Sequence, residues 1–466
     1  MPAYPPHMTL GLAPDLLDGA RRVLAANRLH GLTVPHPRIF PGGFLWDISV
    51  ISKGIAVYDP RQAAADLLRY LESQWLSGML PNEVYFEDPG HREYLFGRHA
   101  DRPAGLTTSG ITQPPMIVRA ALEVGRRLDG EERRAFFEAV FPPLTKLCRW
   151  VLDRRVRGNG LAVSIHPYET GMDNRIDLAR AMAATWHGEH QPLRARAKRA
   201  AFTALAAAVR RAWGDSRSVP PEQRSSHEDV LNAFLQTRHL RSLGYDLDAV
   251  ERSGQGFLVE DVGYNAVLVD AFRCLRELAQ ELDRPHDPQL SVDAALNEAM
   301  TRVSVSLEGL WHEDPAGGTR GYFSRDHRTG TLLLQPTVAG LFPLLVATDP
   351  HRVEAMTQAL TDPAKYWTPV APPSAPLDSA DFTPNRYWQG PAWSFPTDIL
   401  ETALSVQGLD DVAGELRCRY LRRPHGDQHA EYENPLTGEP LGVRSFSPAA
   451  ALAIRFADVE RTSAAI

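Results

Sequence analysis

Two acidic residues, one histidine and one glycine fall within nine positions, residues 166–174. The stretch has neither helical nor strand periodicity, and Pro167 and Gly171 interrupt regular structure, so we expect a shaped loop. Loops held on a rigid scaffold often carry catalytic groups. Glu169 and Asp173 are therefore candidates for acid–base chemistry, and an ordinary polar surface turn is the alternative.

Five further loops share a polar character, and most of them add tryptophan or tyrosine. They cover residues 41–47, 74–83, 110–115, 385–393 and 431–442. A sugar ring offers an apolar face to an aromatic plane and a rim of hydroxyls to polar groups, so such loops suit sugar binding. A buried tryptophan belongs to the core more often than to a site, so only the whole set of loops indicates a carbohydrate ligand.

Glycoside hydrolysis needs two carboxyl groups beside one bond, one protonated and one ionised. The loops at 166–174 and 431–442 are both acidic and are shaped by Gly and Pro, although they lie far apart in the sequence. A helical barrel could bring them to one rim. If Asp173 is buried, its pKa rises by desolvation, which suits a general acid.

Three glutamates compete for the role of general base, namely Glu431, Glu433 and Glu439. The first two would share a face of an extended segment, so alternation cannot separate them. Glu439 lies in a Thr-Gly-Glu-Pro turn, where an acidic residue usually accepts hydrogen bonds. Spacing alone therefore leaves the choice between Glu431 and Glu433 open.

Helical patterns must position these loops. Apolar residues recur at helical spacing, most clearly over 259–282. The expected helices cover residues 61–75, 114–124, 131–156 with a bend or break at Pro142–Pro143, 193–213, 259–282, 292–311, 352–360, 397–406, 411–421 and 448–456. Long loops are expected over 31–60, 78–113, 157–176, 313–336, 362–396 and 422–447, with a short strand at Thr331–Leu334. The sequence thus predicts one helical domain over residues 1–466, in which residues 214–227 form a mobile lid or a plain polar excursion.

Composition limits the classes of partner that we expect the protein to bind. The net charge is −7, with 50 basic and 57 acidic residues spread along the chain, so we expect no basic face for nucleic acid. No signal-peptide pattern and no 18-residue apolar run occur, so we expect no membrane span and a cytoplasmic location. Cys148, Cys274 and Cys418 are scattered and predict neither disulfides nor a metal site. A small carbohydrate ligand and no cofactor are expected, and a homo-oligomer stays open.

Other groups of residues give weaker evidence for a metal or catalytic site. His187 and His190 have a spacing that could bind a metal on one helical turn, but no third ligand is evident, so no metal is predicted. His166 is expected to shape its loop through hydrogen bonds. The chain has no recognisable Ser/His/Asp motif and no Gly-x4-Gly-Lys phosphate loop.

Taken in order, the motifs resemble those of the trehalase and glycoside hydrolase family 63 clan. They are Gly42-Gly43 before Trp46-Asp47, Glu169-Thr170-Gly171-Met172-Asp173, Tyr387-Trp388-Gln389-Gly390-Pro391 and Glu431-Tyr432. Thr-Gln-Pro-Pro at 112–115, Glu260 to Asn265 and Phe446-Ser447 are similar to motifs of the short bacterial glucosylglycerate and mannosylglycerate hydrolases. The resemblance spans about residues 38 to 456 and implies an all-α fold, an (α/α)6 barrel or six-hairpin toroid, and inversion of the anomeric centre.

By that resemblance Asp173 is the general acid and Glu431 is the general base, which ranks Glu431 ahead of Glu433. Seven more positions match residues of the sugar pocket: Trp46, Asp47, Gln113, Tyr387, Trp388, Gly390 and Trp393. The implied reaction is inverting hydrolysis of a small 2-O-α-glycosyl-glycerate to sugar and glycerate. The alternatives are an α-glucosidase acting on trehalose or short α-glucooligosaccharides, and a non-catalytic carbohydrate-binding barrel.

The chain departs from the family pattern at four positions. Ile48 and Ile51 stand where many relatives have Ser and His, Gln389 stands where Arg is common, and Pro448 stands where Trp is usual. These departures bear on the sugar and the aglycone rather than on the reaction. A glycerate carboxylate also needs a cation. The candidates, beside the alternative of plain surface arginines, are Arg175, Arg217 and Arg224.

Overall fold

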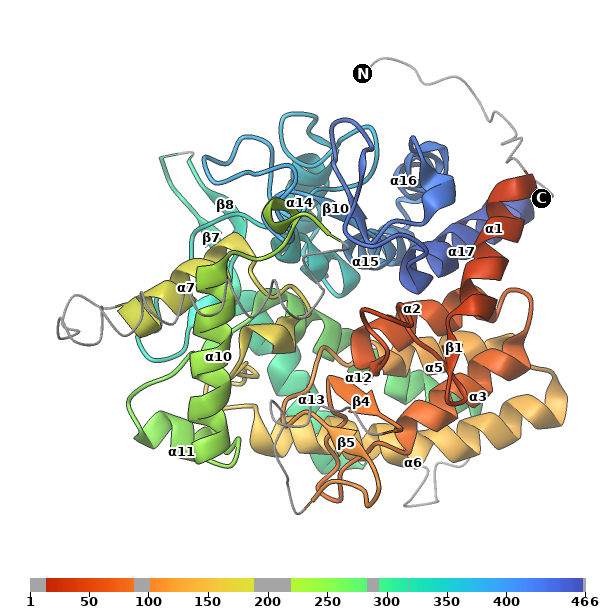
Figure 1. Ribbon diagram of the computed structural model, residues 1–466. Coiled ribbons are helices and arrows are strands. Elements are labelled where there is room, and N and C mark those ends of the chain that lie inside the picture. The colour runs from red at the N-terminus through yellow and green to blue at the C-terminus, as the bar shows by residue number, and fades with distance from the viewer. Residues whose placement is uncertain (1–13, 88–100, 188–218, 283–292, 317, 464–466) are drawn as a thin grey trace.

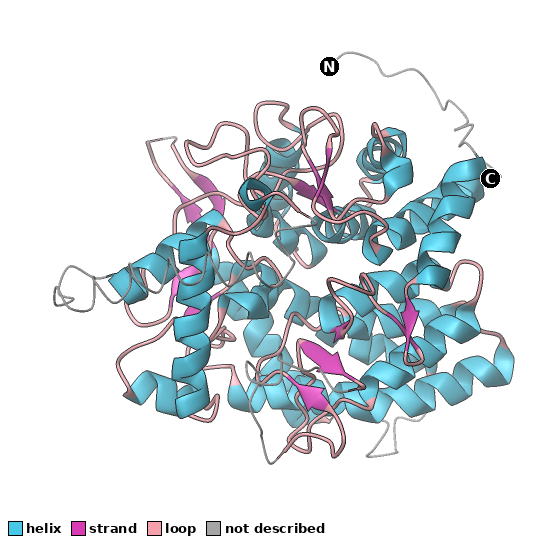
Figure 2. Ribbon diagram, in the orientation of Figure 1, coloured by secondary structure: helices cyan, strands magenta, loops and turns pink. Residues whose placement is uncertain are grey.

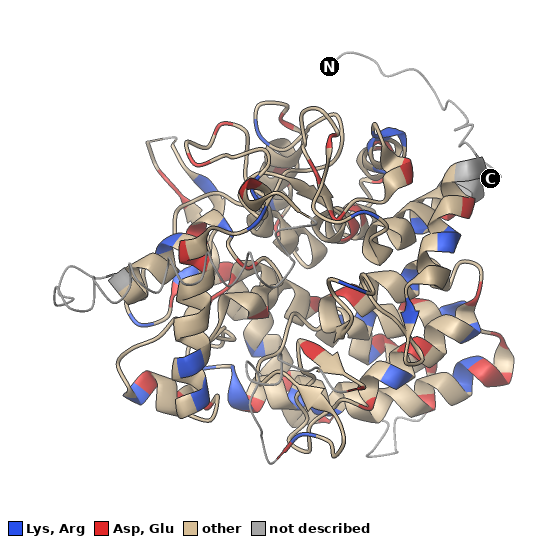
Figure 3. Ribbon diagram, in the orientation of Figure 1, with Lys and Arg blue, Asp and Glu red and all other residues tan. Residues whose placement is uncertain are grey.

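The computed structural model describes residues 14–87, 101–187, 219–282, 293–316 and 318–463. Helices dominate these ranges and are joined by long loops with strands of two or three residues (Figure 2). Acidic and basic residues are interspersed over the elements seen in Figure 3. None of the described helices is long and apolar enough to cross a membrane. The prediction of a mainly helical protein is confirmed.

Within the described ranges, six segments pack in a closed ring, each against the next (Figure 1). In chain order they are α2 (Leu45–Ile55), α5 (Ile117–Arg126), α12 (Val262–Glu281), the 3-10 helix η5 (Val338–Leu345), α15 (Ser394–Val406) and α17 (Ser447–Ser463). Helix α17 closes the ring because it packs against both α15 and α2.

A second set of helices alternates with the ring members along the chain. They are α1 (Pro14–Ala26) beside α17, α3 (Pro60–Leu71) beside α2 and α5, α6 (Gly130–Arg154) beside α5 and α12, α13 (Ala294–Leu307) beside α12, α14 (Pro350–Thr361) beside η5, and α16 (Asp410–Arg422) beside α15 and α17. Because the chain returns through this set, successive ring members run in the same direction. The loops that precede them therefore meet at one end of the ring.

Helix α2 lies inside residues 31–60, where a loop was expected, so that prediction is wrong. All of its residues are buried. A helix enclosed on every side has no polar face, and its sequence shows no apolar stripe to reveal it. The sequence did not predict η5 for the same reason, since all of its residues are buried.

Two other expectations differ from the structure. Helix α6 continues through Pro142 and Pro143, so of the expected bend or break the break is wrong, and buried residues before and after the prolines hold both halves against the core. No strand forms at Thr331–Leu334, where Leu332 makes only an isolated bridge with Arg325. The helix expected at 193–213 lies outside the described residues.

Among the residues that the structure describes between α6 and α12, three helices lie outside the alternating pattern: α7 (Ile176–His187), α10 (His227–Ser242) and α11 (Leu247–Arg252). Helix α10 packs against α7, at the left of Figure 1. It starts with a capping box, in which Ser226 and Asp229 each accept a hydrogen bond from the other's backbone N–H. This cap fixes the direction from which residues 219–226 enter the helix.

Short strands tie the loops together. One sheet joins β3 (Gly43–Phe44), β4 (Glu83–Tyr85) and β5 (Thr107–Thr108), and another joins β10 (Ala392–Trp393), β11 (Tyr432–Glu433) and β12 (Pro440–Leu441). The remaining pairs are β1 (Arg28–Leu29) with β2 (Leu32–Thr33), β6 (Val259–Glu260) with β9 (Arg325–Asp326), and β7 (Trp311–Glu313) with β8 (Arg320–Tyr322). The other 3-10 helices are η2 (Pro167–Thr170), η3 (Pro221–Gln223), η4 (Glu308–Leu310) and η6 (Gly426–Gln428).

Candidate active site

The loop that carries Asp173 is built on the 3-10 helix η2. His166 precedes this helix, and its Nδ1 accepts a hydrogen bond from the backbone N–H of Tyr168 at 3.1 Å. Burial lowers the pKa of His166 to about 4, so the ring stays neutral and able to accept. His166 therefore shapes the loop, as expected.

Gly171 ends η2 with φ +77° and lies on the ring of Trp46. A Cβ at Gly171 would be 3.0 Å from that ring, so both the backbone conformation and the close approach require glycine. Trp46 is itself held by its backbone N–H, which donates to the side-chain oxygen of Gln113 at 3.1 Å. The first turn of α2 and the loop before α5 thus support the loop that carries Asp173.

Glu169, the other acidic residue of this loop, is 1% exposed and bonded inside the protein. One carboxylate oxygen accepts hydrogen bonds from Arg155 at 2.7 Å and from the N–H of Thr112 at 3.3 Å. The other oxygen accepts from the N–H of Ile165 at 2.8 Å. Glu169 therefore stabilises the loop, which leaves Asp173 as its candidate acid.

Asp173 is partly exposed, yet desolvation is the main influence on its carboxyl. Burial raises the pKa of Asp173 to about 7. The negative charge of Glu431 also raises this pKa, while a backbone hydrogen bond and the guanidinium of Arg224 oppose the rise. A carboxyl with a pKa near 7 is largely protonated just below neutral pH, which is what a general acid needs.

Glu431 stands at the start of β11 and is 1% exposed. Its Oε1 accepts a hydrogen bond from Arg224 Nη1 at 2.7 Å, and its Oε2 accepts from the N–H of Val443 at 3.0 Å. The negative charge of Glu431 acts on the pKa of Asp173, which indicates that the two carboxyls lie near each other. The structure thus brings together the two residues expected to form a pair.

The rival glutamates lie in other environments. Glu433 accepts a hydrogen bond from the buried Arg423 at 2.7 Å, which gives it a partner of its own. Glu439 is exposed in the turn before β12. Their positions in the structure therefore favour Glu431 as the candidate base. The spacing of the residues along the sequence could not make this distinction.

Asp47 adds a third carboxyl to the site, in the first turn of α2. Burial raises the pKa of Asp47 well above its ordinary value, and the charges of Glu431, Asp173 and Glu83 raise it further. Several carboxyls so close together cannot all ionise at neutral pH. Asp47 is therefore the member best suited to stay protonated and donate a hydrogen bond.

Aromatic side chains pack beside the acids. The rings of Trp388 and Trp393 stack at 3.9 Å, and Trp393 stacks on Tyr432 at 4.3 Å across the β10–β11 pairing. Tyr387 meets Trp393 edge-on at 5.1 Å and is partly exposed. Trp388 is 2% exposed and Trp393 is 3% exposed, so these two rings chiefly support Tyr387.

Gly390 allows a close backbone approach. A Cβ at this position would lie 2.2 Å from the carbonyl oxygen of Thr383, and the Gly390 N–H donates to the hydroxyl of Ser374 at 2.9 Å. The contacts of Gly390 with Thr383 and Ser374 therefore fix the shape of the 385–393 loop.

The four departures from the family pattern are accommodated by local packing. Ile48 and Ile51 are buried in α2. The side-chain N–H of Gln389 donates to the backbone oxygen of Asn174 at 3.0 Å, joining the aromatic loop to the loop of Asp173. Pro448 lies in the first turn of α17, where proline is well tolerated.

Residues 219–226 also line the site, although no motif singled them out. The carbonyl oxygen of Gln223 accepts hydrogen bonds from the N–H of Tyr387 at 3.2 Å and from the hydroxyl of Tyr432. The side-chain oxygen of Gln223 accepts from the N–H of Gly442 at 3.0 Å. Within the segment 214–227, this part is therefore built into the wall of the site, and residues 214–218 lie outside the described ranges.

The three candidate arginines differ in position. Arg175 is fully buried and pairs with Asp177 at 2.7 Å and with Asp261 at the start of α12, which makes it structural. Arg217 lies outside the described residues, as does His190 of the metal alternative. Arg224 lies within the site. The surface alternative is therefore wrong for Arg175 and Arg224.

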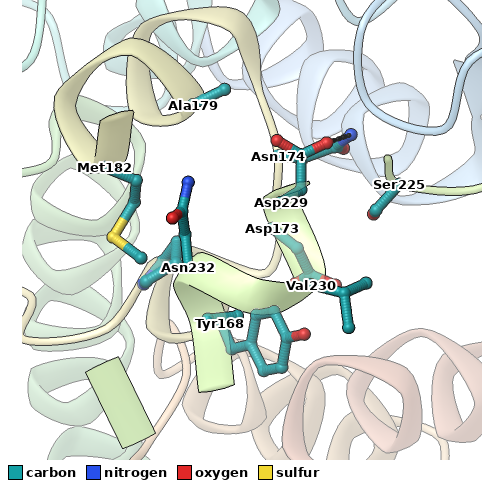
Figure 4. A pocket seen from close by; sticks show the side chains of 11 residues that line it. Tyr168, Asp173, Asn174, Ala179, Met182, Ser225, Asp229, Val230 and Asn232 are labelled. Atoms are coloured by element: carbon teal, nitrogen blue, oxygen red, sulfur yellow. Dashed lines mark hydrogen bonds between the residues drawn. The ribbon is translucent and has the colours of Figure 1, made fainter. Parts of the chain in front are cut away.

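A small cavity of about 20 Å³ adjoins Asp173, with room for about one water molecule. Figure 4 shows Asp173 beside the start of α10, with Asn174 directed at Asp229. The side-chain N–H of Asn174 donates to Asp229 at 3.3 Å. The lining residues are Pro167, Tyr168, Asp173, Asn174, Ala179, Met182, Ser225, Asp229, Val230, Asn232 and Ala233.

Comparisons with known proteins identify the family of this chain. Residues 40–447 match the family model of the mannosylglycerate hydrolase MGH1-like glycoside hydrolase domain. Mannosylglycerate hydrolase of Thermus thermophilus is 34% identical over 451 residues, 93% of this chain and 99% of the relative. Glucosylglycerate hydrolase of Mycolicibacterium hassiacum is 28% identical over 478 residues, 96% of this chain and 99% of the relative.

Solved structures give the same result. The crystal structure of a family 63 mannosylglycerate hydrolase from Thermus thermophilus with Tris and D-glycerate has a TM-score of 0.78 at 29% identity, over 94% of this chain and 99% of that one. Neutral trehalase Nth1 of Saccharomyces cerevisiae has a TM-score of 0.55 at 14% identity, over 91% and 72%, and so shares the fold alone. The chain therefore belongs to the MGH1-like glycoside hydrolases of family 63, as its motifs predicted.

Proposed function

We propose that this glycoside hydrolase cleaves a small 2-O-α-glycosyl-glycerate, with mannose or glucose as the sugar, and inverts the anomeric centre. The observation that carries the proposal is the pairing of two unlike carboxyls in one site. Asp173 has a pKa raised to about 7, and Glu431 is anchored beside a cation. The related mannosylglycerate and glucosylglycerate hydrolases support the choice of substrate.

In the proposed reaction, Asp173 donates its proton to the glycosidic oxygen while the bond from that oxygen to the anomeric carbon breaks. Glu431 takes a proton from a water molecule that attacks the same carbon from the opposite face. The products are glycerate and a sugar of inverted configuration. Asp173 is then ionised and Glu431 protonated, and proton exchange with solvent restores both groups.

The sugar would lie between α2 and the aromatic wall. Tyr387 offers ring surface, whereas Trp46, which is 2% exposed, and Gln113, which holds it, would act through the first turn of α2. Asp47, with a pKa well above its ordinary value, would donate a hydrogen bond to a sugar hydroxyl. Trp388, Trp393 and Gly390 would act through the shape of their loop.

Arg224 is the proposed cation for the glycerate carboxylate. It carries a permanent positive charge, and that charge acts on the carboxyls of both Asp173 and Glu431. The aglycone departs from the side of the acid, so a cation near Asp173 is well placed to bind it. The guanidinium also lies 5.6 Å from the ring centre of Tyr387.

We also infer that the ring and its second set of helices form a single (α/α)6 barrel over residues 1–466. Six ring members that alternate with six neighbours support this architecture. A cytoplasmic location is proposed as well, which the buried cysteines Cys148 and Cys274, outside any disulfide, support.

A substrate panel tests the proposal. Mannosylglycerate, glucosylglycerate, trehalose and maltose are each offered to the enzyme, and proton NMR follows the first anomer of the released sugar. We expect the highest kcat/KM for a glycosyl-glycerate and the β-anomer as first product. A preference for trehalose or maltose would contradict the proposed substrate and favour an α-glucosidase. An initial α-anomer would exclude inversion.

A further inference from the structure

The proposed general base is held by a direct contact with a cation. Glu431 Oε1 and Arg224 Nη1 are 2.7 Å apart, and both side chains are at least nine-tenths buried. A positive charge in direct contact favours the ionised form of a carboxylate and so weakens it as a base. The contact with Arg224 therefore opposes proton uptake by Glu431 while Arg224 remains in place.

Glu431 also has a second anchor that does not depend on Arg224. The N–H of Val443 donates to Oε2 at 3.0 Å, and Gly442 leaves no space for a side chain, because a Cβ there would be 2.4 Å from Oε2. The carboxylate can therefore keep its position when the bond to Oε1 is lost. Such a loss would open Oε1 to water.

Arg224 is positioned to accept another anion. Its guanidinium lies 5.7 Å from the ring centre of Phe40 and 5.6 Å from that of Tyr387, so aromatic rings adjoin it. Its charge also reaches Asp173, on the side from which the aglycone leaves. An incoming carboxylate would thus meet the same guanidinium that holds Glu431.

We propose that Arg224 exchanges partners during turnover, binding Glu431 in the free enzyme and the substrate carboxylate in the Michaelis complex, so that an anionic aglycone releases the general base. The inference rests on the proposed function and extends it. Selection for glycerate would then act on the chemical step, through kcat, as well as on binding. No covalent bond changes in the exchange, since one guanidinium moves between two carboxylates.

The first test compares an α-glycosyl-glycerate with the α-glycosyl-glycerol that differs only by a hydroxymethyl group in place of the carboxylate. We expect the wild-type kcat to be roughly 10- to 100-fold higher for the glycerate, the range of a partly lost general base. In Arg224→Gln the kcat for the glycerol should rise above the wild-type value while that for the glycerate falls. A merely structural arginine would lower both, and that result would overturn the proposal.

Arg180→Gln is the matched control, because Arg180 pairs with Asp381 at the exposed surface. The Arg180→Gln variant should keep the wild-type ratio of the two kcat values. For every variant, kcat is taken at the plateau of its pH profile. Equal wild-type kcat values, with discrimination confined to KM, would overturn the exchange while leaving glycerate hydrolysis intact. Absence of hydrolysis of any glycosyl-glycerate would instead contradict the proposed function.

A second test needs no variant. An α-glycosyl fluoride has a leaving group that needs little acid assistance, so its hydrolysis reports on the base. Added D-glycerate should increase kcat at saturating fluoride, and a crystal structure with D-glycerate should place Arg224 beyond 4 Å from Glu431, outside ion-pair range. Inhibition without any rise in kcat, or an Arg224–Glu431 contact unchanged from 2.7 Å, would refute the exchange.

Discussion

The side-chain oxygen of Asn174 accepts a hydrogen bond from the backbone N–H of Trp388 at 3.2 Å. The bond links the loop of Asp173 to the aromatic loop, 214 positions further along the chain. The backbone oxygen of Asn174 also accepts from Gln389, so the two loops are joined twice. The position of the proposed acid therefore depends on the loop that carries the aromatic wall.

Replacing Asn174 by Ala should weaken both the fold and the activity. The buried N–H of Trp388 would lose its partner, at a cost of about 1–3 kcal/mol in the free energy of unfolding. A displaced Asp173 should lower kcat by roughly 10- to 100-fold. Urea unfolding and steady-state kinetics measure the two effects, and a variant with unchanged kcat would show that the acid is held by η2 alone.

Removing either proposed catalytic carboxyl should strongly lower turnover, and Glu431→Gln should also lower stability because it breaks the buried pair with Arg224. Asp173→Asn and Glu431→Gln should each lower kcat by about 10²- to 10⁴-fold, as expected for loss of a general acid or base. Glu433→Gln is the contrasting variant, since it breaks the buried pair with Arg423 and should lower stability by about 3–5 kcal/mol while keeping most of the kcat of the folded enzyme. If Glu433→Gln were inactive but Glu431→Gln active, the base would be reassigned to Glu433.

The pH dependence should follow the acid. Because Asp173 must be protonated and its pKa is about 7, kcat/KM should fall tenfold per unit once the pH rises above this value. The folded pKa also exceeds the ordinary value of 3.8, so the stabilising contribution of this group is complete below pH 3.8 and is lost as the pH rises through about 7.

Two measurements check this dependence. The kcat/KM profile from pH 5 to 9 should show the alkaline decline. Wild-type protein should also lose more stability between pH 5 and 8 than Asp173→Asn, which cannot titrate at this position. A flat profile up to pH 9 would mean that another group supplies the proton.

Gly442 and Gly330 form a matched pair of glycines. Both have positive φ, +65° and +69°, so alanine should cost roughly 1–2 kcal/mol at either position. Only at Gly442 would the new methyl group meet the carboxylate of Glu431, so Gly442→Ala should also lower kcat by about 100-fold. Equal kcat values for the two variants would show that Glu431 adjusts freely and that its position is not critical.

The local character of the chain was readable from the sequence. Apolar residues at helical spacing predicted the partly exposed helices, such as α3 and α16, because one face of each meets water. Pro167 and Gly171 predicted the bend that presents Asp173. Polar and aromatic residues grouped in loops also predicted the sugar site, since side-chain chemistry is carried by residue type.

Tertiary structure alone decided which of these groups meet. Helix α2 shows no stripe because every side of it is buried, and Glu431 differs from Glu433 only in the neighbours that packing supplies. Arg224 has no motif, and its place beside Glu431 depends on how the cap of α10 directs the chain. The loop at residues 166–174 became half of a site only through contacts with residues more than two hundred positions away, and such contacts depend on packing in space rather than on spacing along the chain.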